Sequence, residues 1–479
     1  MTTGYIDLQA QITKLTVPHS LFALSSSDKY HCPMDRDKPI QSVSFKTLGC
    51  KLNQSESDAI MAKFEENQFR VRPFGEEVDL TIINTCTVTN DADSKSRATI
   101  RRAIRNSPRG RVVVTGCYAQ VKPEDIQTIN GVDLILGNDE KYHIFDHLNK
   151  LQHGKLEEPL TIVNDEGEFT SVSEDGFISA TSRTRVFLKI QEGCDYYCSY
   201  CIIPFARGKA RSRPFTQTID EARKLVDQGY REIVLTGINI GTYHTANGKQ
   251  NLVDLLSALE QINGLDRVRV SSIEPNTVTD DLLHLVAGSK VICDHLHIPL
   301  QSANDDQLSA MNRKYRLEEY ARLMARFRTI LPTAALGTDV IVGFPGETEA
   351  HFEKTTAFIQ AQPFTYLHIF RYSPREGTVA AKLDNPVQFH EIKRRSVVLH
   401  EVSQKLKFAY AEKFSGQTLK VLFDQFRDGL ASGYTRNYLR VQVPATQDIS
   451  QSILPVTLSR SDRGNLQGTL AGEIVREVV

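Results

Sequence analysis

Three cysteines stand close together near the middle of the chain, in the run Gly193-Cys194-Asp-Tyr-Tyr-Cys198-Ser-Tyr-Cys201. At this spacing the three thiolates can converge on one inorganic centre. A [4Fe–4S] cluster held by three cysteines keeps one iron without a protein ligand, and that iron can bind a small molecule. A structural zinc would need a fourth Cys or His nearby, and the next histidine is only His244. The spacing therefore predicts an iron–sulfur cluster with an open iron.

Cys50, Cys86 and Cys117 are far apart in the sequence, and by spacing alone they would be ordinary buried cysteines. However, each closely follows a predicted apolar strand, and Gly49 and Gly116 allow sharp loops just before two of them. The three predicted strands are 43–48, 80–84 and 112–115. The carboxyl ends of parallel strands share one edge of a sheet, where ligands bind. Their placement therefore favours a second open cluster.

Small and polar residues follow or end several predicted strands in the second half of the chain. Active sites of barrel enzymes lie at the carboxyl ends of the strands. Glycine lets a ligand approach the backbone, while Asn and Glu side chains can bind an amino acid or a ribose. The candidate cofactor-binding residues are Gly237, Asn239, Ser272, Glu274 and Asp339, together with Tyr200 of the three-cysteine loop.

Strands and helices must position these residues, and their predicted order indicates an α/β chain of about three domains. A flexible N-terminal arm at 1–40 is predicted to precede them. Strands and helices alternate over 41–152, which indicates a doubly wound parallel sheet. Residues 153–180 are polar and acidic and are predicted to be a linker. Six strand-then-helix units over 181–411 predict an incomplete (β/α)6 barrel. Period-two strands over 412–479 indicate a small antiparallel β-barrel.

Local groups of basic residues suggest a nucleic-acid partner, although the 479-residue chain has a formal net charge of only −1. Arginine and lysine contacts to phosphates supply sequence-independent affinity for RNA. The candidates for such contacts are Arg97, Arg101, Arg207, Arg211, Arg436 and Arg440. No secretory signal and no apolar run long enough for a membrane span is visible, so we expect a cytoplasmic protein without a membrane partner. Cys293 is predicted to be a buried small hydrophobe.

These motifs resemble the radical S-adenosylmethionine superfamily, and the chain after residue 40 resembles its methylthiotransferases. The matching stretches are Thr47–Gln54, Ile83–Thr89, Val114–Gln120, Gly193–Arg213, His297–Ser302 and Gly337–Thr348. Within the family, Phe187–Gln191, Ser271–Pro275 and Lys95–Arg97 are most similar to the branch that acts on threonylcarbamoyladenosine beside the tRNA anticodon. Ala303-Asn304 departs from the usual Gly-Ser of the family and puts only a local turn in question.

The resemblance implies a methylthiotransferase domain, a radical domain and a C-terminal TRAM domain. It implies that Cys194, Cys198 and Cys201 hold the cluster that cleaves S-adenosylmethionine, and that the other trio holds a second [4Fe–4S] cluster carrying sulfur. The expected partners are tRNA, a reductant such as flavodoxin or ferredoxin, and a sulfur source. The alternatives are the branches acting on isopentenyladenosine in tRNA or on a ribosomal-protein aspartate, and a zinc-containing RNA-binding module without enzymatic activity.

Overall fold

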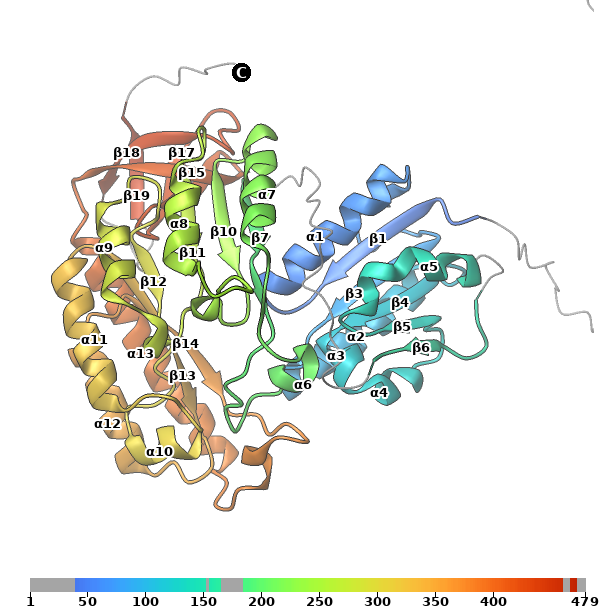
Figure 1. Ribbon diagram of the computed structural model, residues 1–479, viewed down its shortest axis with the longest axis horizontal. Coiled ribbons are helices and arrows are strands. Elements are labelled where there is room, and N and C mark those ends of the chain that lie inside the picture. The colour runs from blue at the N-terminus through green and yellow to red at the C-terminus, as the bar shows by residue number, and fades with distance from the viewer. Residues whose placement is uncertain (1–38, 152–154, 165–183, 460–465, 472–479) are drawn as a thin grey trace, which may run out of the picture.

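The computed structural model describes residues 39–151, 155–164, 184–459 and 466–471. Figure 1 shows the N-terminal sheet domain on one side, the central barrel on the other, and the C-terminal strands packed on one end of that barrel. The arm predicted for 1–40 lies almost entirely outside the described residues, as does Cys32. None of the helices in the described part of the chain has the length and apolar content of a membrane span.

The N-terminal domain is a parallel sheet of six strands in the order β2-β1-β3-β4-β5-β6. Every residue of β3 and β4 is buried, because apolar clusters cover both faces of the sheet. This confirms the doubly wound sheet. Its elements are β1 (Ser42–Thr47), α1 (Lys51–Glu66), β2 (Arg70–Arg72), β3 (Leu80–Thr85), α2 (Asn90–Asn106), β4 (Arg111–Gly116), α3 (Cys117–Val121), α4 (Pro123–Gln127), β5 (Leu134–Leu136), α5 (Ile144–Leu148) and β6 (Leu160–Ile162).

One part of the predicted linker belongs to this domain. Leu160–Ile162 forms β6, which pairs in parallel with β5 and so extends the sheet. A strand of three residues is too short for its apolar pattern to stand out among polar and acidic neighbours. Residues 165–180 of the predicted linker lie outside the part of the chain that the structure describes.

The central domain is an open barrel made of two three-stranded parallel sheets, β11-β10-β7 and β12-β13-β14. Isolated bridges join the two sheets at Val268 with Ile292 and at Ser272 with His297. No pairing within the described residues joins β7 to β14, so the barrel stays incomplete, as predicted. The strands are β7 (Arg185–Lys189), β10 (Glu232–Thr236), β11 (Arg267–Val270), β12 (His295–His297), β13 (Ala335–Val342) and β14 (Tyr366–Arg371).

The helices of this domain follow the strands, and most of them cover the outside of the barrel, where one large apolar cluster lies between helices and strands. The helices are α6 (Ile203–Arg207), α7 (Phe215–Asp227), α8 (Leu252–Glu260), α9 (Asp280–Gly288), α10 (Asp305–Ala310), α11 (Leu317–Ile330), α12 (Glu349–Ala361) and α13 (Phe389–Glu412). α6 lies beside α3 of the N-terminal domain instead.

The C-terminal strands form a closed barrel in the order β15-β16-β17-β19-β18. The pairs are antiparallel except for β17 with β19, which is parallel. β16 does not show the period-two pattern, because Gly433 interrupts it. A Cβ at this position would lie 2.1 Å from the Leu422 carbonyl oxygen and collide with it. The strands are β15 (Thr418–Arg427), β16 (Leu430–Thr435), β17 (Arg440–Pro444), β18 (Ile453–Ser459) and β19 (Leu466–Leu470).

Candidate active site with two cysteine trios

The three-cysteine loop is closed at its base by a short antiparallel pair, β8 (Gln191–Glu192) with β9 (Arg211–Ser212). Gly193 starts the loop with φ +69, and a Cβ there would lie 1.9 Å from the Lys209 carbonyl oxygen. Only glycine therefore fits this position. The Gln191 carboxamide oxygen accepts hydrogen bonds from the backbone N–H groups of Ile238 and Asn239 at 2.9 and 2.8 Å. The loop is thus tied to the carboxyl end of β10.

The segment after α10 holds the middle of the loop. The Ser199 hydroxyl donates to the Ala310 carbonyl at 2.7 Å, and the Asn312 amide donates to the Tyr197 carbonyl at 2.8 Å. Tyr197 has a positive φ of 48, so this stretch needs such support. The position of the cysteines therefore depends on α10 as well as on the barrel strands.

Burial opposes the ionised form of the loop cysteines. Burial, together with the charge of the Cys198 thiolate, raises the pKa of Cys201 to about 12 and that of Cys194 to about 11. Three thiolates can share this place only if a cationic centre lies between them. The chemistry of the donors therefore fits a cluster.

Arg313 is a site residue that the sequence analysis missed. Its guanidinium pairs with the Glu274 carboxylate and donates to Cys198 Sγ at 3.2 Å. It lies directly after the helix–loop segment that holds Ser199, and nothing in the sequence pattern around it indicates that it faces the cysteines. Arg313 joins a predicted cluster ligand to a predicted cofactor-binding carboxylate.

The other predicted cofactor-binding residues stand at the carboxyl ends of neighbouring strands. Asn239 is 2% exposed, yet neither polar atom of its amide has a hydrogen-bond partner among the described residues. A buried amide without a partner is costly unless a ligand satisfies it. Gly237 lies two residues before Asn239, where a Cβ would approach the Gln191 carbonyl oxygen to 2.8 Å. Asn239 and Glu274 therefore offer polar groups to a ligand at this end of the barrel, and their role in binding the cofactor stays a prediction.

The remaining three candidates are distributed around the same end of the barrel. The Tyr200 ring packs edge-on against Phe344, and its hydroxyl lies 3.4 Å from Arg313. Ser272 is exposed just after β11. Asp339 accepts hydrogen bonds from two histidines, and its role in binding the cofactor stays a prediction.

The second trio comes together at one edge of the N-terminal sheet. Cys50 precedes α1, Cys86 follows β3, and Cys117 is the first residue of α3 after β4. These loops follow three neighbouring strands of the sheet. Burial and the Cys117 thiolate raise the pKa of Cys86 to about 12. Cys50 is accessible to solvent, yet surrounding protein atoms desolvate its thiol and raise its pKa as well.

Glycines allow the close approach of these loops. Gly49 has φ +99, and a Cβ there would lie 2.8 Å from the Cys86 Cβ. Gly116 has φ +94, and a Cβ there would lie 2.3 Å from the Asn84 carboxamide oxygen. The sharp loops expected before two of the cysteines are therefore present.

Neither trio is arranged for a single metal ion. Zn–S bonds of about 2.3 Å in a tetrahedral site put sulfurs roughly 3.8 Å apart. Within the described residues, the only three Cys, His, Asp or Glu residues whose ligand atoms all lie within 4.8 Å of one another are His297, Asp339 and His368. The cysteine sulfurs are spread more widely, which fits a multi-iron cluster better than zinc.

The RNA contact predicted for Arg207 is wrong, because the side chain is fully buried between the two trios. Its guanidinium donates to Glu56 and Glu192 at 2.7 Å each, and to the Asn53 amide oxygen at 2.7 Å. Asn53 also lies 3.7 Å from Cys50 Sγ. A buried guanidinium among carboxylates is a structural ion-pair network, not a phosphate-binding surface.

Other contacts cross the same interface. The Asn138 amide nitrogen lies 3.9 Å from Cys117 Sγ and donates to the Ala206 carbonyl at 2.7 Å. Figure 1 shows α6, which contains Ala206, beside α3, which starts at Cys117. Lys141 and Lys189 complete the buried charge network around Glu56. The two trios therefore belong to one composite site.

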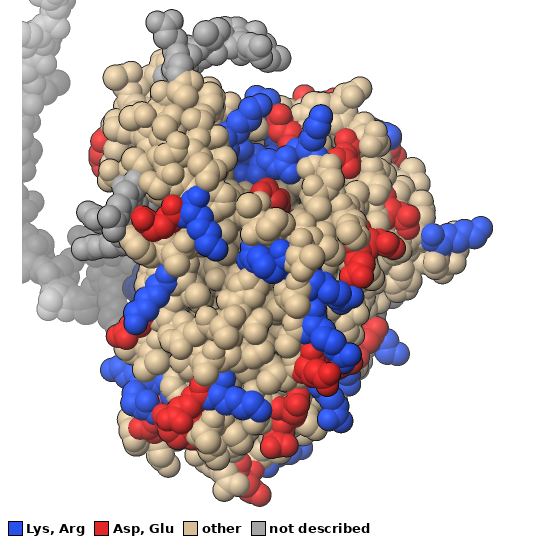
Figure 2. All heavy atoms as spheres, turned by 90° about the vertical axis from the view of Figure 1, so that its left-hand side faces the viewer, with Lys and Arg blue, Asp and Glu red and all other residues tan. Residues whose placement is uncertain are grey.

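The other arginines predicted to bind RNA differ in exposure. Arg101 is exposed on α2, whereas Arg97 donates to the Tyr118 hydroxyl at 2.7 Å. Arg211 donates to two carbonyls of the cysteine loop, and Arg440 donates to the Tyr434 hydroxyl at 3.0 Å. On the face that Figure 2 presents, blue and red side chains are intermixed, with a group of blue side chains in a hollow near the top.

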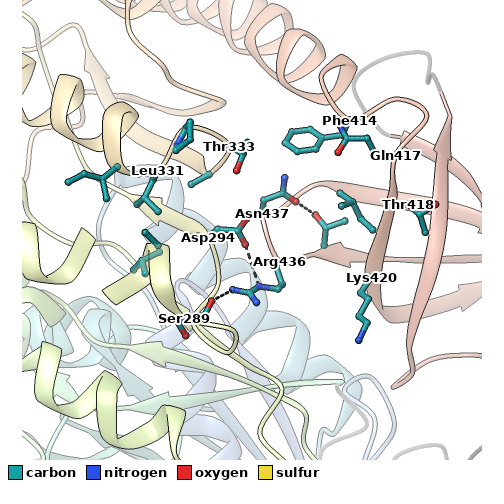
Figure 3. Close-up of a pocket in the computed structure, with 17 residues that line it drawn as sticks. Ser289, Asp294, Leu331, Thr333, Phe414, Gln417, Thr418, Lys420, Arg436 and Asn437 are labelled. Atoms are coloured by element: carbon teal, nitrogen blue, oxygen red, sulfur yellow. Dashed lines mark hydrogen bonds and ion pairs between the residues drawn. The ribbon is translucent and has the colours of Figure 1, made fainter. Parts of the chain in front are cut away.

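A cavity of about 540 Å³ separates the C-terminal barrel from the ends of α9 and α11 (Figure 3). Arg436 crosses this junction and donates to the carbonyls of Ser289 and Ile292 at 3.0 and 2.7 Å. Its guanidinium also lies 3.5 Å from the Asp294 carboxylate. Arg436 thus docks the two domains, and its predicted RNA contact gains no support here.

Cys293 is fully buried, as predicted.

Comparison with known proteins gives a consistent picture. Residues 42–137 match the model described as "Uncharacterized protein family UPF0004", and residues 188–359 match the radical SAM superfamily. The threonylcarbamoyladenosine tRNA methylthiotransferase MtaB of Bacillus subtilis is 40% identical over 88% of this chain and 94% of its own length. The MtaB of Thermotoga maritima is 36% identical over 84% and 91%. The tRNA-2-methylthio-N(6)-dimethylallyladenosine synthase of Endomicrobium trichonymphae is 32% identical over 89% and 99%.

A solved structure shares the fold. The radical S-adenosylmethionine methyltransferase TsrM of Kitasatospora setae, with cobalamin and a [4Fe-4S] cluster bound, superposes with a TM-score of 0.52. It covers 82% of this chain and 80% of its own, at 15% identity.

Proposed function

The chain belongs to the family of radical S-adenosylmethionine methylthiotransferases, and we propose that it inserts a methylthio group at carbon 2 of N6-threonylcarbamoyladenosine, beside the anticodon of tRNA. The observation that carries this proposal is the composite site with its two cysteine trios, in a chain that matches threonylcarbamoyladenosine enzymes along most of its length. Four such relatives are 34–40% identical to the chain, against 29–32% for four relatives that make the methylthio-dimethylallyl product.

Cys194, Cys198 and Cys201 would hold one [4Fe–4S] cluster, and Cys50, Cys86 and Cys117 the other. The first cluster, when bound, would supply the one-electron cleavage of S-adenosylmethionine, and the second would carry the sulfur. A radical is needed because no side-chain base of pKa about 4–10 can usefully deprotonate carbon 2 of adenine. The residues of the chain do the positioning. Asn239 offers an unsatisfied buried amide, and Arg313 keeps the Glu274 carboxylate oriented beside the cysteine loop.

The remaining partners follow from this chemistry. We propose a small electron-transfer protein such as flavodoxin or ferredoxin as the reductant, and a separate sulfur donor that replenishes the cluster held by the second trio. Since the substrate is tRNA, the protein would work in the cytoplasm.

The test is a reaction of anaerobically reconstituted protein with S-adenosylmethionine, a reductant and tRNA that carries threonylcarbamoyladenosine. We expect mass spectrometry of the digested tRNA to show the 2-methylthio derivative of that nucleoside. In parallel reactions the tRNA carries dimethylallyladenosine or unmodified adenosine. A product formed only on the dimethylallyl tRNA, or on none of the three, would contradict the proposal.

A further inference from the structure

Three side chains that can ligate a metal ion meet on neighbouring strands of the open barrel. They are His297 of β12, Asp339 of β13 and His368 of β14. Asp339 Oδ1 lies 2.7 Å from His297 Nε2 and 3.3 Å from His368 Nδ1. The ligand atoms of the three residues all lie within 4.8 Å of one another. Two imidazoles and one carboxylate therefore converge on a single point.

The register of the strands turns these side chains toward the interior of the barrel. His297 is paired with Gly337, and Asp339 is paired with His368. Val340 belongs to the apolar cluster that lies between the strands and the helices. Because side chains alternate along a strand, Asp339 faces the opposite way, into the barrel. The three ligands thus share the inner face.

The His–Asp–His group lies near the cysteine loop but includes no cysteine of either trio. Ile341 follows Asp339 by two residues, which is about 6.6 Å along a strand. Ile341 packs in one apolar cluster with Tyr200 of the cysteine loop, while Ala335, at the other end of β13, packs with the core of the C-terminal barrel. The group therefore lies between the C-terminal barrel and the cysteine loop.

A further hydrogen bond fixes the buried histidine. The Tyr366 hydroxyl lies 3.3 Å from His297 Nδ1 and 2.8 Å from His295 Nε2. Gly337 makes room for this contact, because a Cβ there would collide with the Tyr366 ring and lie 2.6 Å from His297 Nδ1. A metal-ligating histidine almost always uses its other ring nitrogen in such a hydrogen bond, which fixes its orientation. His297 is therefore held with Nε2 directed at the point of convergence.

Exposure shows which side of the group is open. The side chains of His297 and Asp339 are 5% and 18% exposed, whereas that of His368 is 56% exposed. The two imidazoles are stacked, with ring centroids 4.8 Å apart, so the exposed ring is held against the buried one. Catalytic zinc sites have three protein ligands and keep a further position for water or substrate. An ion here would have its remaining positions on the accessible side, beside His368.

The three groups are already placed for an ion. Without one, each ring can donate an N–H to the same oxygen atom, Asp339 Oδ1. Metal binding requires neutral imidazole and ionised carboxylate, so an ion would replace the two protons between these atoms. Zn–N and Zn–O bonds of about 2.1 Å in a tetrahedral site put ligand atoms roughly 3.4 Å apart. The His368 contact already has this length, and the His297 contact would widen by about 0.7 Å.

We propose that His297, Asp339 and His368 bind one divalent transition-metal ion of the zinc type. The ligands would be His297 Nε2, His368 Nδ1 and an oxygen of Asp339. Imidazole ligands suit zinc, whereas magnesium and calcium prefer oxygen ligands alone. The site goes beyond the proposed function and does not depend on which nucleoside the enzyme modifies. It gives Asp339 a role other than the predicted contact with S-adenosylmethionine.

The test measures zinc bound by the reconstituted holoenzyme, in which iron fills both cysteine trios. The protein is dialysed anaerobically against Zn²⁺ with an excess of Mg²⁺, separated from free metal, and analysed for zinc and iron. We expect about one zinc per chain in wild type, beside about eight irons. His368→Ala and Asp339→Asn should keep the iron and bind zinc at least about 10-fold more weakly. Tyr366→Phe keeps all three ligands and should weaken zinc binding by about 10-fold.

His390→Ala is the matched control, because its ring is 77% exposed on α13, outside the group. It should bind zinc as wild type does. Zinc that both ligand variants retain as tightly as wild type would overturn the proposal, because the ion would then be held elsewhere. So would zinc that rises only as iron falls, since it would occupy the cysteine trios. Wild-type protein that keeps all its iron and binds no zinc would overturn the proposal as well.

Discussion

At the scale of single residues, we expect the loop trio to be needed for S-adenosylmethionine cleavage and the N-terminal trio to be needed only for methylthio insertion. Cys86→Ala removes one ligand of the N-terminal trio and leaves the cysteine loop intact. We expect bound iron to fall from about eight to about four atoms per chain, with S-adenosylmethionine cleavage kept and methylthio insertion lost. Cys198→Ala should lose both activities. Iron analysis and product chromatography check this, and full methylthio insertion by Cys86→Ala would disprove the two-cluster assignment.

Gly116, directly before Cys117, has a steric role that can be measured by comparing its substitution with that of Gly229. In Gly116→Ala the new Cβ would lie 2.3 Å from the Asn84 carboxamide oxygen and 2.5 Å from the Thr85 carbonyl, whereas at Gly229, with nearly the same φ, it would meet nothing within 4 Å. Gly229→Ala should cost only the left-handed strain of about 1–2 kcal/mol. Gly116→Ala should cost about 1–3 kcal/mol more, and lose iron from the N-terminal trio. Denaturation curves and iron content would show this, and equal losses in the two variants would contradict it.

At the scale of elements, Asn304, where the chain departs from the family pattern, caps the helix that supports the cysteine loop. Asn304 is the N-cap of α10, and its side chain accepts a hydrogen bond from the Gln307 N–H at 3.0 Å. The far end of α10 holds Ser199 of the cysteine loop. Asn304→Ala should therefore cost about 1 kcal/mol and raise hydrogen exchange in the cysteine loop. Asn304→Ser keeps a capping oxygen and serves as the control, so exchange that rises equally in both variants would contradict this link.

Sequence reasoning succeeded for elements with strong periodic patterns. The strands predicted at 80–84 and 112–115 match β3 and β4 to within one residue at each end, because their apolar runs are typical of buried strands in a parallel sheet. It missed β2 and β6, which have three residues each. Arg313 was also missed, since its partner Glu274 is 39 residues away and only the barrel brings the two together. Contacts across the fold leave no local pattern in the chain.

At the scale of the whole molecule, the composite site exists only where two domains meet. Arg207 follows the cysteine loop in the sequence, and its partner Glu56 lies 151 residues away on α1 of the other domain. Its surroundings in the sequence are basic, which suggested an RNA contact, because a local run of charges does not reveal whether one member is buried. Burial alone would raise the pKa of Glu56, but the Arg207 guanidinium and the ammonium groups of Lys141 and Lys189 hold it well below its usual range. The ionised network therefore fixes one trio relative to the other.

Removal of Arg207 should reveal this coupling. In Arg207→Met the carboxylates of Glu56 and Glu192 lose their shared partner inside the interface, and breaking a buried ion pair in this way costs about 3–5 kcal/mol. We expect a lower unfolding temperature, and loss of methylthio insertion even in protein that still cleaves S-adenosylmethionine. Arg109→Met is the control, since the Arg109 side chain is 92% exposed and its ion pair with Glu77 is long, at 3.7 Å. If both variants unfold and react like wild type, Arg207 does not hold the two trios together.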